Sequence, residues 1–300
     1  MHPLLHLNWN ITYRCPLSCA HCYSRALADT PELDLPGKLA VCENIIKSGV
    51  FSVNLGGGEP IFHPDTEHVV RRLSSSNVHV TLCTSGFMVG KDEVRAIAEA
   101  GLRTSYVSID DVRPAHHDAV RGASGVLESA LAAVRLFKDR DIEVGISCAI
   151  TSDNISRLSD IAALAESIGA SSVEFKRLKP QGNATALRDL LLSPEEEVLL
   201  YDLIPRIKAE RGIGVSLIYG ARKVDGVDEG CPCGKTIMSI MSDGTIAPCV
   251  YNPIRIGDAT RDDLLAVWAT APQIEHLRNS GTCAGLEAAH PSGGGSDEQL

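Results

Sequence analysis

The sequence predicts an α/β fold, a partial (β/α)6 barrel of six strand–helix units followed by a small C-terminal module. Two observations predict it. Short runs rich in β-branched residues alternate with longer stretches of helical spacing, which is typical of a parallel sheet covered by helices. Cysteines, glycines and polar residues stand directly after several predicted strands, where parallel barrels bind their ligands.

The six units follow one another over residues 1–212. The predicted strands are His6–Thr12, Phe51–Leu55, Val78–Cys83, Thr104–Ile109, Glu143–Ile150 and Ser172–Leu178. The predicted helices are Pro36–Ser48, Pro64–Ser74, Lys91–Ala100, Gly125–Asp139, Ile155–Ile168 and Pro194–Arg211. In such a TIM-like barrel the strands end at one mouth, so the residues that follow them would form one site.

The strand–helix alternation ends near Gly212, and we expect a small module over residues 213–290 and a disordered, Gly- and Ser-rich tail over residues 291–300. The module is predicted to hold two strands joined by an Asp-Gly turn, then a helix. These elements cover Ile237–Met241, Thr245–Ala247 and Arg261–Asn279.

The composition indicates a folded protein of the cytoplasm. Hydrophobic residues make up 44% of the 300 residues, which is enough for a sizeable core. Lys and Arg total 28 against 38 Asp and Glu, and the resulting net charge of −10 argues against a nucleic-acid binder. The sequence has neither a signal-peptide pattern nor an apolar run of about 18 residues, so we expect no membrane partner.

Three cysteines, Cys15, Cys19 and Cys22, follow the first predicted strand within eight residues. A [4Fe–4S] cluster has four irons to ligate, so three thiolates would leave one iron open to an outside ligand. The alternative is a zinc site, in which His21 or His2 supplies the missing ligand.

The spacing Cys-x3-Cys-x2-Cys after a first strand resembles the radical S-adenosylmethionine (radical SAM) superfamily. Further stretches over Leu7 to Leu178 agree with this resemblance, each at or just after the end of a predicted strand. The matching residues are His21, Gly57-Gly58-Glu59-Pro60, Ser85, Ser108 with Asp110, and His117-Asp118-x-x-Arg121-Gly122. The resemblance implies that His21, Gly57, Gly58, Glu59, Pro60, Ser85, Ser108 and Asp110 contact S-adenosylmethionine, and that Arg177 meets its methionyl carboxylate.

The resemblance also implies the chemistry. A reduced [4Fe–4S] cluster would cleave S-adenosylmethionine to methionine and a 5′-deoxyadenosyl radical, which abstracts hydrogen from an unactivated carbon of an organic substrate. Such an enzyme needs a one-electron donor, for which flavodoxin or ferredoxin is the expected partner. No substrate acid or base can be named from the sequence.

A second set of cysteines, Cys231, Cys233, Cys249 and Cys283, resembles the auxiliary-cluster modules called SPASM and twitch, because Gly244 stands five residues before Cys249. Four thiolates suit one fully ligated second [4Fe–4S] cluster, and no further cysteine follows to hold a third. Zinc, with the same ligands or with His290 in place of one thiolate, is the alternative.

The remaining cysteines, Cys42, Cys83 and Cys148, are predicted to be core residues. Cys83 and Cys148 stand in strands, where an inward-facing thiol could instead return a hydrogen atom to a substrate. Tyr13, Tyr23 and His63 fit either the cavity wall or barrel-edge packing.

The sequence defines the substrate less closely than it defines the chemistry. The first cluster cysteine is residue 15, and a peptide-modifying relative often carries a leader-binding domain ahead of it, so the sequence favours a small natural product or cofactor precursor that undergoes dehydrogenation, decarboxylation or related tailoring. One alternative is a maturase that crosslinks or epimerises a ribosomally made peptide with the help of a separate leader-binding protein. Another is a non-catalytic iron–sulfur electron carrier.

Overall fold

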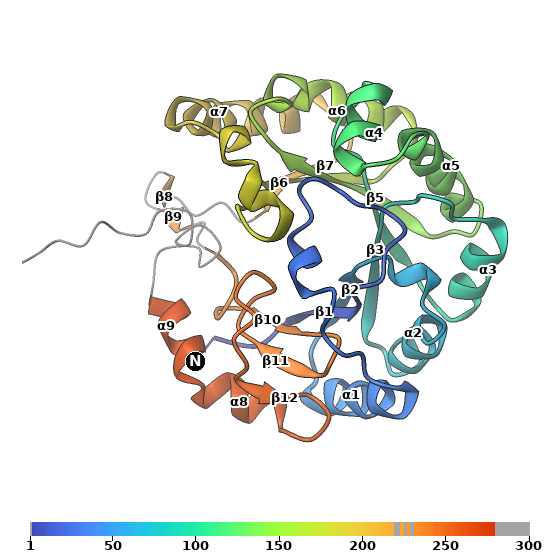
Figure 1. Ribbon diagram of the computed structural model, residues 1–300, viewed down its shortest axis with the longest axis vertical. Coiled ribbons are helices and arrows are strands. Elements are labelled where there is room, and N and C mark those ends of the chain that lie inside the picture. Colours follow the sequence, from blue (N-terminus) through green and yellow to red (C-terminus); the bar gives the residue numbers. More distant parts are fainter. Residues whose placement is uncertain (1, 219–222, 225–226, 229–230, 280–300) are drawn as a thin grey trace, which may run out of the picture.

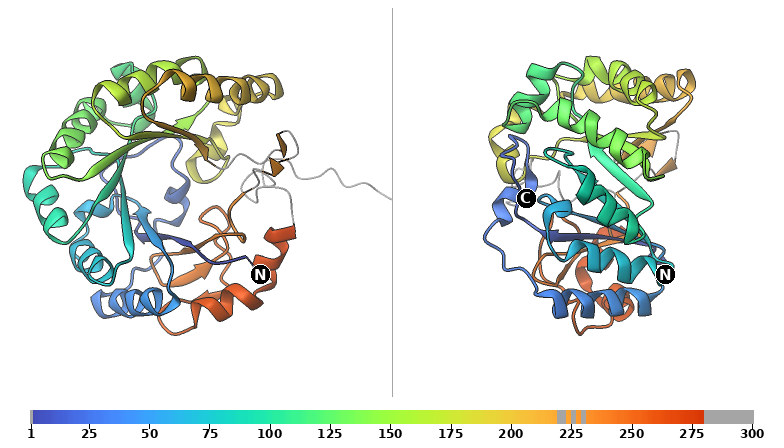
Figure 2. Two further views of the ribbon diagram at one scale, coloured as in Figure 1. Left: turned by 180° about the vertical axis from the view of Figure 1, so that it is seen from behind. Right: turned by 90° about the vertical axis from the view of Figure 1, so that its right-hand side faces the viewer.

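The computed structural model describes residues 2–218, 223–224, 227–228 and 231–279. One curved sheet forms an open ring, and the helices cover its outer face (Figures 1 and 2). The parallel strands of the ring are β1 (His6–Thr12), β2 (Ser52–Gly57), β3 (His79–Thr84), β4 (Thr104–Ser108), β5 (Glu143–Ile150), β6 (Ser172–Arg177) and β7 (Gly214–Ile218).

Three more strands extend the sheet beyond β1. They are β10 (Ile237–Ile240), β11 (Thr245–Ala247) and β12 (Gly257–Asp258), and the sheet order is β12-β11-β10-β1-β2-β3-β4-β5-β6-β7. Among the described strands, β12 and β7 each have only one neighbour, so the ring does not close. The predicted partial α/β barrel is confirmed. A separate two-stranded ribbon joins β8 (Lys223–Val224) to β9 (Val227–Asp228).

The helices lie between successive strands and after the hairpin. They are α1 (Leu35–Ser48), α2 (Thr66–Ser74), α3 (Lys91–Glu99), α4 (Pro114–Arg121), α5 (Val126–Lys138), α6 (Leu158–Ser167), α7 (Pro194–Glu210), α8 (Leu264–Thr270) and α9 (Pro272–Asn279). Helix α5 shows why they pack on the sheet. It buries Ala130, Ala133, Val134 and Phe137, which share one face at the helical period. Within the described residues no helix is both long and apolar enough to cross a membrane.

The strands separate the core from the lumen of the ring. In β1, Leu7, Trp9 and Ile11 are fully buried in the core, whereas Asn8 and Asn10 line a cavity. Alternate residues of a strand point to opposite faces, so one strand supplies both the core and the site.

The structure corrects the prediction that the strand–helix alternation ends near Gly212. Strand β7 follows α7 and pairs in parallel with β6, with Gly214 opposite Ser172. This strand has only five residues and starts at a glycine, so its period-2 signal is weak. The predicted hairpin is confirmed as β10 and β11, and β10 pairs in parallel with β1. One sheet thus runs through both predicted domains, and their boundary at residue 212 stays a prediction.

Two helices also differ from the sequence prediction. The single helix expected over Arg261–Asn279 is divided into α8 and α9 at Ala271, whose backbone is extended before Pro272. Helix α4 was missed because its short, polar sequence buries only His117 and Arg121. Cys283, His290 and the tail over residues 291–300 lie outside the described residues.

Candidate functional site

A cavity of about 280 Å³ lies at the carboxyl ends of strands β1 to β6. Most of the site residues predicted near this mouth line it. They are Cys15, Cys19, His21, Cys22, Gly57, Gly58, Glu59, Ser85, Ser108, Asp110 and Arg177. Pro60 does not line the cavity but begins a short turn over Pro60–Phe62. Strands distant in sequence therefore bring the predicted residues to one place.

The loop after β1 presents three free thiols to this cavity. Burial raises the pKa of Cys15 to about 11 and also raises that of Cys19. A thiolate that is costly to form in the free protein is stabilised by a metal ligated to it, because the metal supplies the missing positive charge. Two contacts fix the loop: Ala20 N donates to Val120 O (2.8 Å), and the Asn183 side chain donates to Cys19 O (3.0 Å).

The glycine-rich loop after β2 lies directly against the start of the cysteine loop. Gly58 N donates to Thr12 O (2.7 Å), and Glu59 N donates to Arg14 O (2.8 Å). A Cβ atom at Gly58 would collide with the Arg14 carbonyl, and Gly57 adopts a φ of 113° that favours glycine. The two glycines are therefore required for this close approach.

Glu59 is buried with one oxygen held and one unused. Its Oε2 accepts hydrogen bonds from Ser85 N (2.8 Å) and Ser85 Oγ (2.6 Å). Its Oε1 is also buried and has no hydrogen-bond partner within the described residues. Burial raises the pKa of the carboxyl. A bound cation at Oε1 would satisfy this atom and favour the ionised form.

Asp110 is the centre of a buried ionic network beside the cysteine loop. Its Oδ2 lies 2.7 Å from Arg121 Nη2 and 3.1 Å from His21 Nε2, and its Oδ1 accepts from Ala149 N (2.9 Å). Burial opposes ionisation, but the charge of Arg121 and the contact with His21 outweigh it and hold the pKa of Asp110 below its usual range. The positive charge of Arg121 also opposes the rise in the pKa of the Cys19 thiol. The network therefore braces the loop.

Three of the late cysteines are buried together in one apolar group and do not line the cavity. Cys231, Cys233 and Cys249 are buried beside Leu277, and Cys233 lies within hydrogen-bonding reach of both other thiols, which raises its pKa. The fourth predicted ligand, Cys283, lies outside the described residues. Within the described chain, no three His, Cys, Asp or Glu side chains are grouped as the ligands of a single metal ion would be.

Comparison with known families decides the identity. The model of the radical SAM superfamily matches residues 9–165, which contain the cysteine loop, the glycine-rich loop and Asp110. The chain belongs to the radical SAM superfamily. A second model, that of the SPASM iron–sulfur cluster-binding domain, matches residues 231–287 and covers the late cysteines.

Similar proteins have several activities. The chain is 26% identical to the PqqA peptide cyclase of Gluconobacter oxydans, over 93% of this chain and 80% of that one. It is 29% identical to the mycofactocin maturase MftC of Mycobacterium ulcerans (92% and 78%), and 24% identical to the AdoMet-dependent heme synthase of Methanosarcina barkeri (90% and 84%). Among solved structures, Streptococcus suis SuiB bound to its precursor peptide SuiA has the same fold, with a TM-score of 0.77, 17% identity, and coverage of 93% of this chain and 68% of that one.

Radical SAM enzymes with a SPASM domain use S-adenosylmethionine and [4Fe–4S] clusters, and the donor set of this chain fits both groups. Three thiols share one cavity wall, and the unused Glu59 Oε1 suits an ammonium group in the same cavity. When bound, the first cluster and S-adenosylmethionine supply a 5′-deoxyadenosyl radical.

Arg177 lines the cavity at the end of β6, but its guanidinium is already engaged. Arg177 Nη1 lies 2.6 Å from Glu197 Oε1 on α7, while its buried Nε has no hydrogen-bond partner in the described structure. Arg177 thus forms an ion pair within the protein, and a bound carboxylate would have to share this side chain with Glu197.

Several cavity residues were not predicted from the sequence. They are Asn8, Asn10, Asn54, Ser147, Lys176, Lys179 and Tyr251. The signal for most of them is a polar side chain at alternate positions of a strand whose other residues are apolar. Tyr251 gave no such signal, since the fold brings it from the C-terminal part of the chain to Tyr23, where the two rings are tilted against each other with their centroids 4.9 Å apart.

The three isolated cysteines differ in where they lie. Cys42 and Cys148 are fully buried core residues, as predicted, whereas Cys83 lines the cavity. Tyr13 and Tyr23 also line it, and His63 instead joins a network behind the wall.

Proposed function

We propose that this chain is a maturase that modifies a ribosomally made precursor peptide at a carbon atom. This departs from the small-molecule substrate that the sequence favours. The start of the chain is no basis for choosing between the two. The proposal rests on the wall of the cavity and is supported by the relatives.

One observation of the cavity carries the proposal. Asn54 Nδ2 donates to Asn8 Oδ1 at 3.1 Å, and both residues line the cavity. This contact uses one donor and one acceptor, which leaves Asn8 Nδ2 and Asn54 Oδ1 for a ligand. A donor next to an acceptor matches the C=O and N–H groups that a peptide backbone presents.

The relatives support the same substrate class. The PqqA peptide cyclase and the mycofactocin maturase each align over more than nine-tenths of this chain. SuiB, whose fold is similar, was solved with its precursor peptide.

We further propose individual roles for the predicted residues. Cys15, Cys19 and Cys22 hold the first cluster, and Cys231, Cys233, Cys249 and Cys283 hold the auxiliary cluster. Glu59 binds the methionyl ammonium beside the backbone of Gly57, Gly58 and Pro60. Arg177 binds the methionyl carboxylate, and His21, Ser85, Ser108 and Asp110 contact the remainder of the nucleoside. A flavodoxin or ferredoxin of the cytoplasm supplies the electron.

The test is an anaerobic reaction of the cluster-loaded protein with S-adenosylmethionine, dithionite and the synthetic peptide encoded by a short reading frame beside its gene. We expect 5′-deoxyadenosine and a peptide of altered mass, with deuterium passing from labelled peptide into 5′-deoxyadenosine. Cys22→Ala is the control and should give neither product. Peptide of unchanged mass, together with 5′-deoxyadenosine in amounts that do not depend on it, would contradict the proposal.

A small carboxylated substrate is the second candidate, because Lys176 and Lys179 join Arg177 at the end of β6 in the cavity. The similarity to AdoMet-dependent heme synthase favours it. Transfer of deuterium from a porphyrin precursor, and not from the peptide, would identify this candidate. An electron carrier would bind S-adenosylmethionine without ever yielding 5′-deoxyadenosine.

A further inference from the structure

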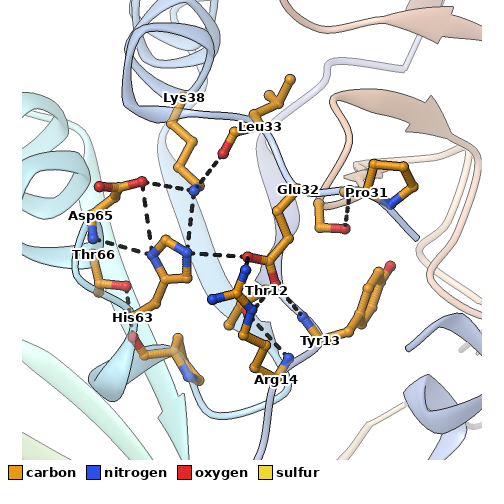
Figure 3. A network of polar contacts seen from close by, with 12 residues as sticks. Thr12, Tyr13, Arg14, Pro31, Glu32, Leu33, Lys38, His63, Asp65 and Thr66 are labelled. Atoms are coloured by element: carbon orange, nitrogen blue, oxygen red, sulfur yellow. Dashed lines mark hydrogen bonds and ion pairs between the residues drawn. The ribbon is translucent and has the colours of Figure 1, made fainter. Parts of the chain in front are cut away.

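Behind the cavity wall lies a buried network of titratable side chains, Glu32, Lys38, His63 and Asp65 (Figure 3). None of the four lines the cavity in the described structure. The Lys38 side chain is 2% exposed, that of His63 7% and that of Glu32 12%. Groups this deeply buried are costly to desolvate, and they are kept only where their partners compensate.

Lys38 supplies the positive charge of the network. Its Nζ donates to Leu33 O (2.7 Å) and to Asp65 Oδ2 (2.8 Å). These bonds join helix α1, the segment before it and the start of α2. Removal of either charged partner would leave the other buried without compensation.

His63 connects this pair to Glu32. Asp65 N donates to His63 Nδ1 (3.1 Å), which places the ring proton of the neutral imidazole on Nε2. This nitrogen lies 3.3 Å from Glu32 Oε2, to which it can donate, and also 3.3 Å from Lys38 Nζ, with which it then shares no hydrogen bond. Burial, followed by the charge of Lys38, lowers the pKa of His63 and keeps the ring neutral. Figure 3 shows the contact between His63 and Glu32, in which the neutral ring is the donor.

Glu32 in turn holds the last residues before the cysteine loop. Its Oε1 accepts from Thr12 Oγ1 (2.6 Å) and from Tyr13 N (3.4 Å), and its Oε2 lies 3.2 Å from Arg14 Nη2. Cys15 is the next residue. On the other side, His63 N donates to Pro60 O (3.1 Å), one residue after Glu59.

The Glu32–His63 contact therefore connects the segment before the cysteine loop with the segment after Glu59. The backbone hydrogen bonds of Gly58 and Glu59 connect the same two parts of the chain. We propose that Glu32 and His63, supported by Lys38, are positioning residues for S-adenosylmethionine: they fix the cysteine loop relative to Glu59, so that the cluster and the ammonium site face the same ligand. They do so without touching the ligand.

The test compares Glu32→Gln with two variants of its partner, Thr12→Val and Thr12→Ser. Glu32→Gln preserves the shape but removes the charge, Thr12→Val removes the hydroxyl, and Thr12→Ser keeps it. Glu43→Gln is the matched control, since Glu43 forms an exposed ion pair with Arg72 on the outer surface. The anaerobically reconstituted full chain is measured for iron content, melting temperature, affinity for S-adenosylmethionine, and the EPR spectrum of the reduced cluster with and without it.

We expect Glu32→Gln and Thr12→Val to keep their iron but to bind S-adenosylmethionine on the order of tenfold more weakly, because a hydrogen bond to a charged group is lost. The EPR change that S-adenosylmethionine induces should be altered in both variants. Thr12→Ser should restore both properties, and Glu43→Gln should leave them unchanged. Wild-type affinity and EPR response in Glu32→Gln would overturn the proposal. So would losses of affinity that merely follow the melting temperature across all four variants.

Discussion

At the scale of single residues, the two oxygens of the buried Glu59 carboxyl differ: one is bound within the protein, and the other remains for a ligand. Oε2 is held by Ser85, and Oε1 is unused among the described residues. We predict that Glu59→Gln keeps the fold but weakens S-adenosylmethionine binding by tenfold or more, since a hydrogen bond between charged groups contributes about 1.5–3 kcal/mol. Anaerobic titration calorimetry measures this. Glu67→Gln, on the surface of α2, should bind normally, and wild-type affinity in Glu59→Gln would remove Glu59 from the site.

Substitutions at Gly58 and Gly56 form a matched pair that tests the close contact between the glycine-rich loop and the cysteine loop. A Cβ at Gly58 meets the Arg14 carbonyl, whereas one at Gly56 has no neighbour nearer than 3.9 Å. We predict that Gly58→Ala destabilises the protein by about 1–3 kcal/mol or more and lowers its iron content, since overpacking displaces the cysteine loop. Gly56→Ala should stay within about 1 kcal/mol of the wild type by the same reasoning. Equal melting temperatures and iron contents for the two variants would contradict this account.

At the scale of elements, the sequence predicts the strands and helices whose apolar residues recur at a regular period. Strands β1 to β6 were located because buried runs of six or so residues recur between helices of regular spacing. Helix α4 was not located, because its contribution is ionic: Arg121 pairs with Asp110, and no apolar face reports it. The motif at His117 and Arg121 was nevertheless visible as a family resemblance, and the structure supplies the physical reason for it.

Helix α4 also leads to a prediction for pH. His117 is fully buried, and burial lowers its pKa to about 4, against an ordinary value of 6.5. Between these values the unfolded chain binds a proton that the folded protein does not, so stability falls as the pH decreases from about 6.5 to about 4. The contribution of His117 to this fall is on the order of 3 kcal/mol.

His117→Asn tests this, because an amide oxygen can accept the bond that Asp110 N donates to His117 Nδ1 (3.2 Å). We expect the variant to lose less stability than the wild type over that pH range in anaerobic thermal melts. Parallel pH profiles for the two proteins would show that His117 is not the responsible group. His68, exposed on α2, provides the control as His68→Asn.

At the scale of the whole molecule, long-range pairing is the part that the sequence did not predict. The hairpin was expected to belong to a separate module, yet β10 pairs with β1, and Leu33 N donates to Ser242 O (2.9 Å) at the hairpin turn. Asn44 on α1 donates to Ala259 O and Asp262 O (3.0 and 2.6 Å). Local patterns report which strands exist but not which distant strand lies beside them, so Tyr251 could not be assigned to the cavity in advance.

This continuity leads to a prediction for the auxiliary cysteines. Because β10 and β11 are held by β1 and α1, the variant Cys233→Ala/Cys249→Ala should lose one cluster without losing the other. Iron should fall from about eight to about four per chain, as expected for two [4Fe–4S] clusters and then one. S-adenosylmethionine should still change the EPR spectrum of the remaining cluster, since the cysteine loop and Glu59 are not altered. If the wild type contains about four irons together with zinc, the late cysteines hold zinc instead of a second cluster. If the variant loses all its iron, the two cluster sites depend on each other, and the sheet alone does not maintain the site at Cys15, Cys19 and Cys22.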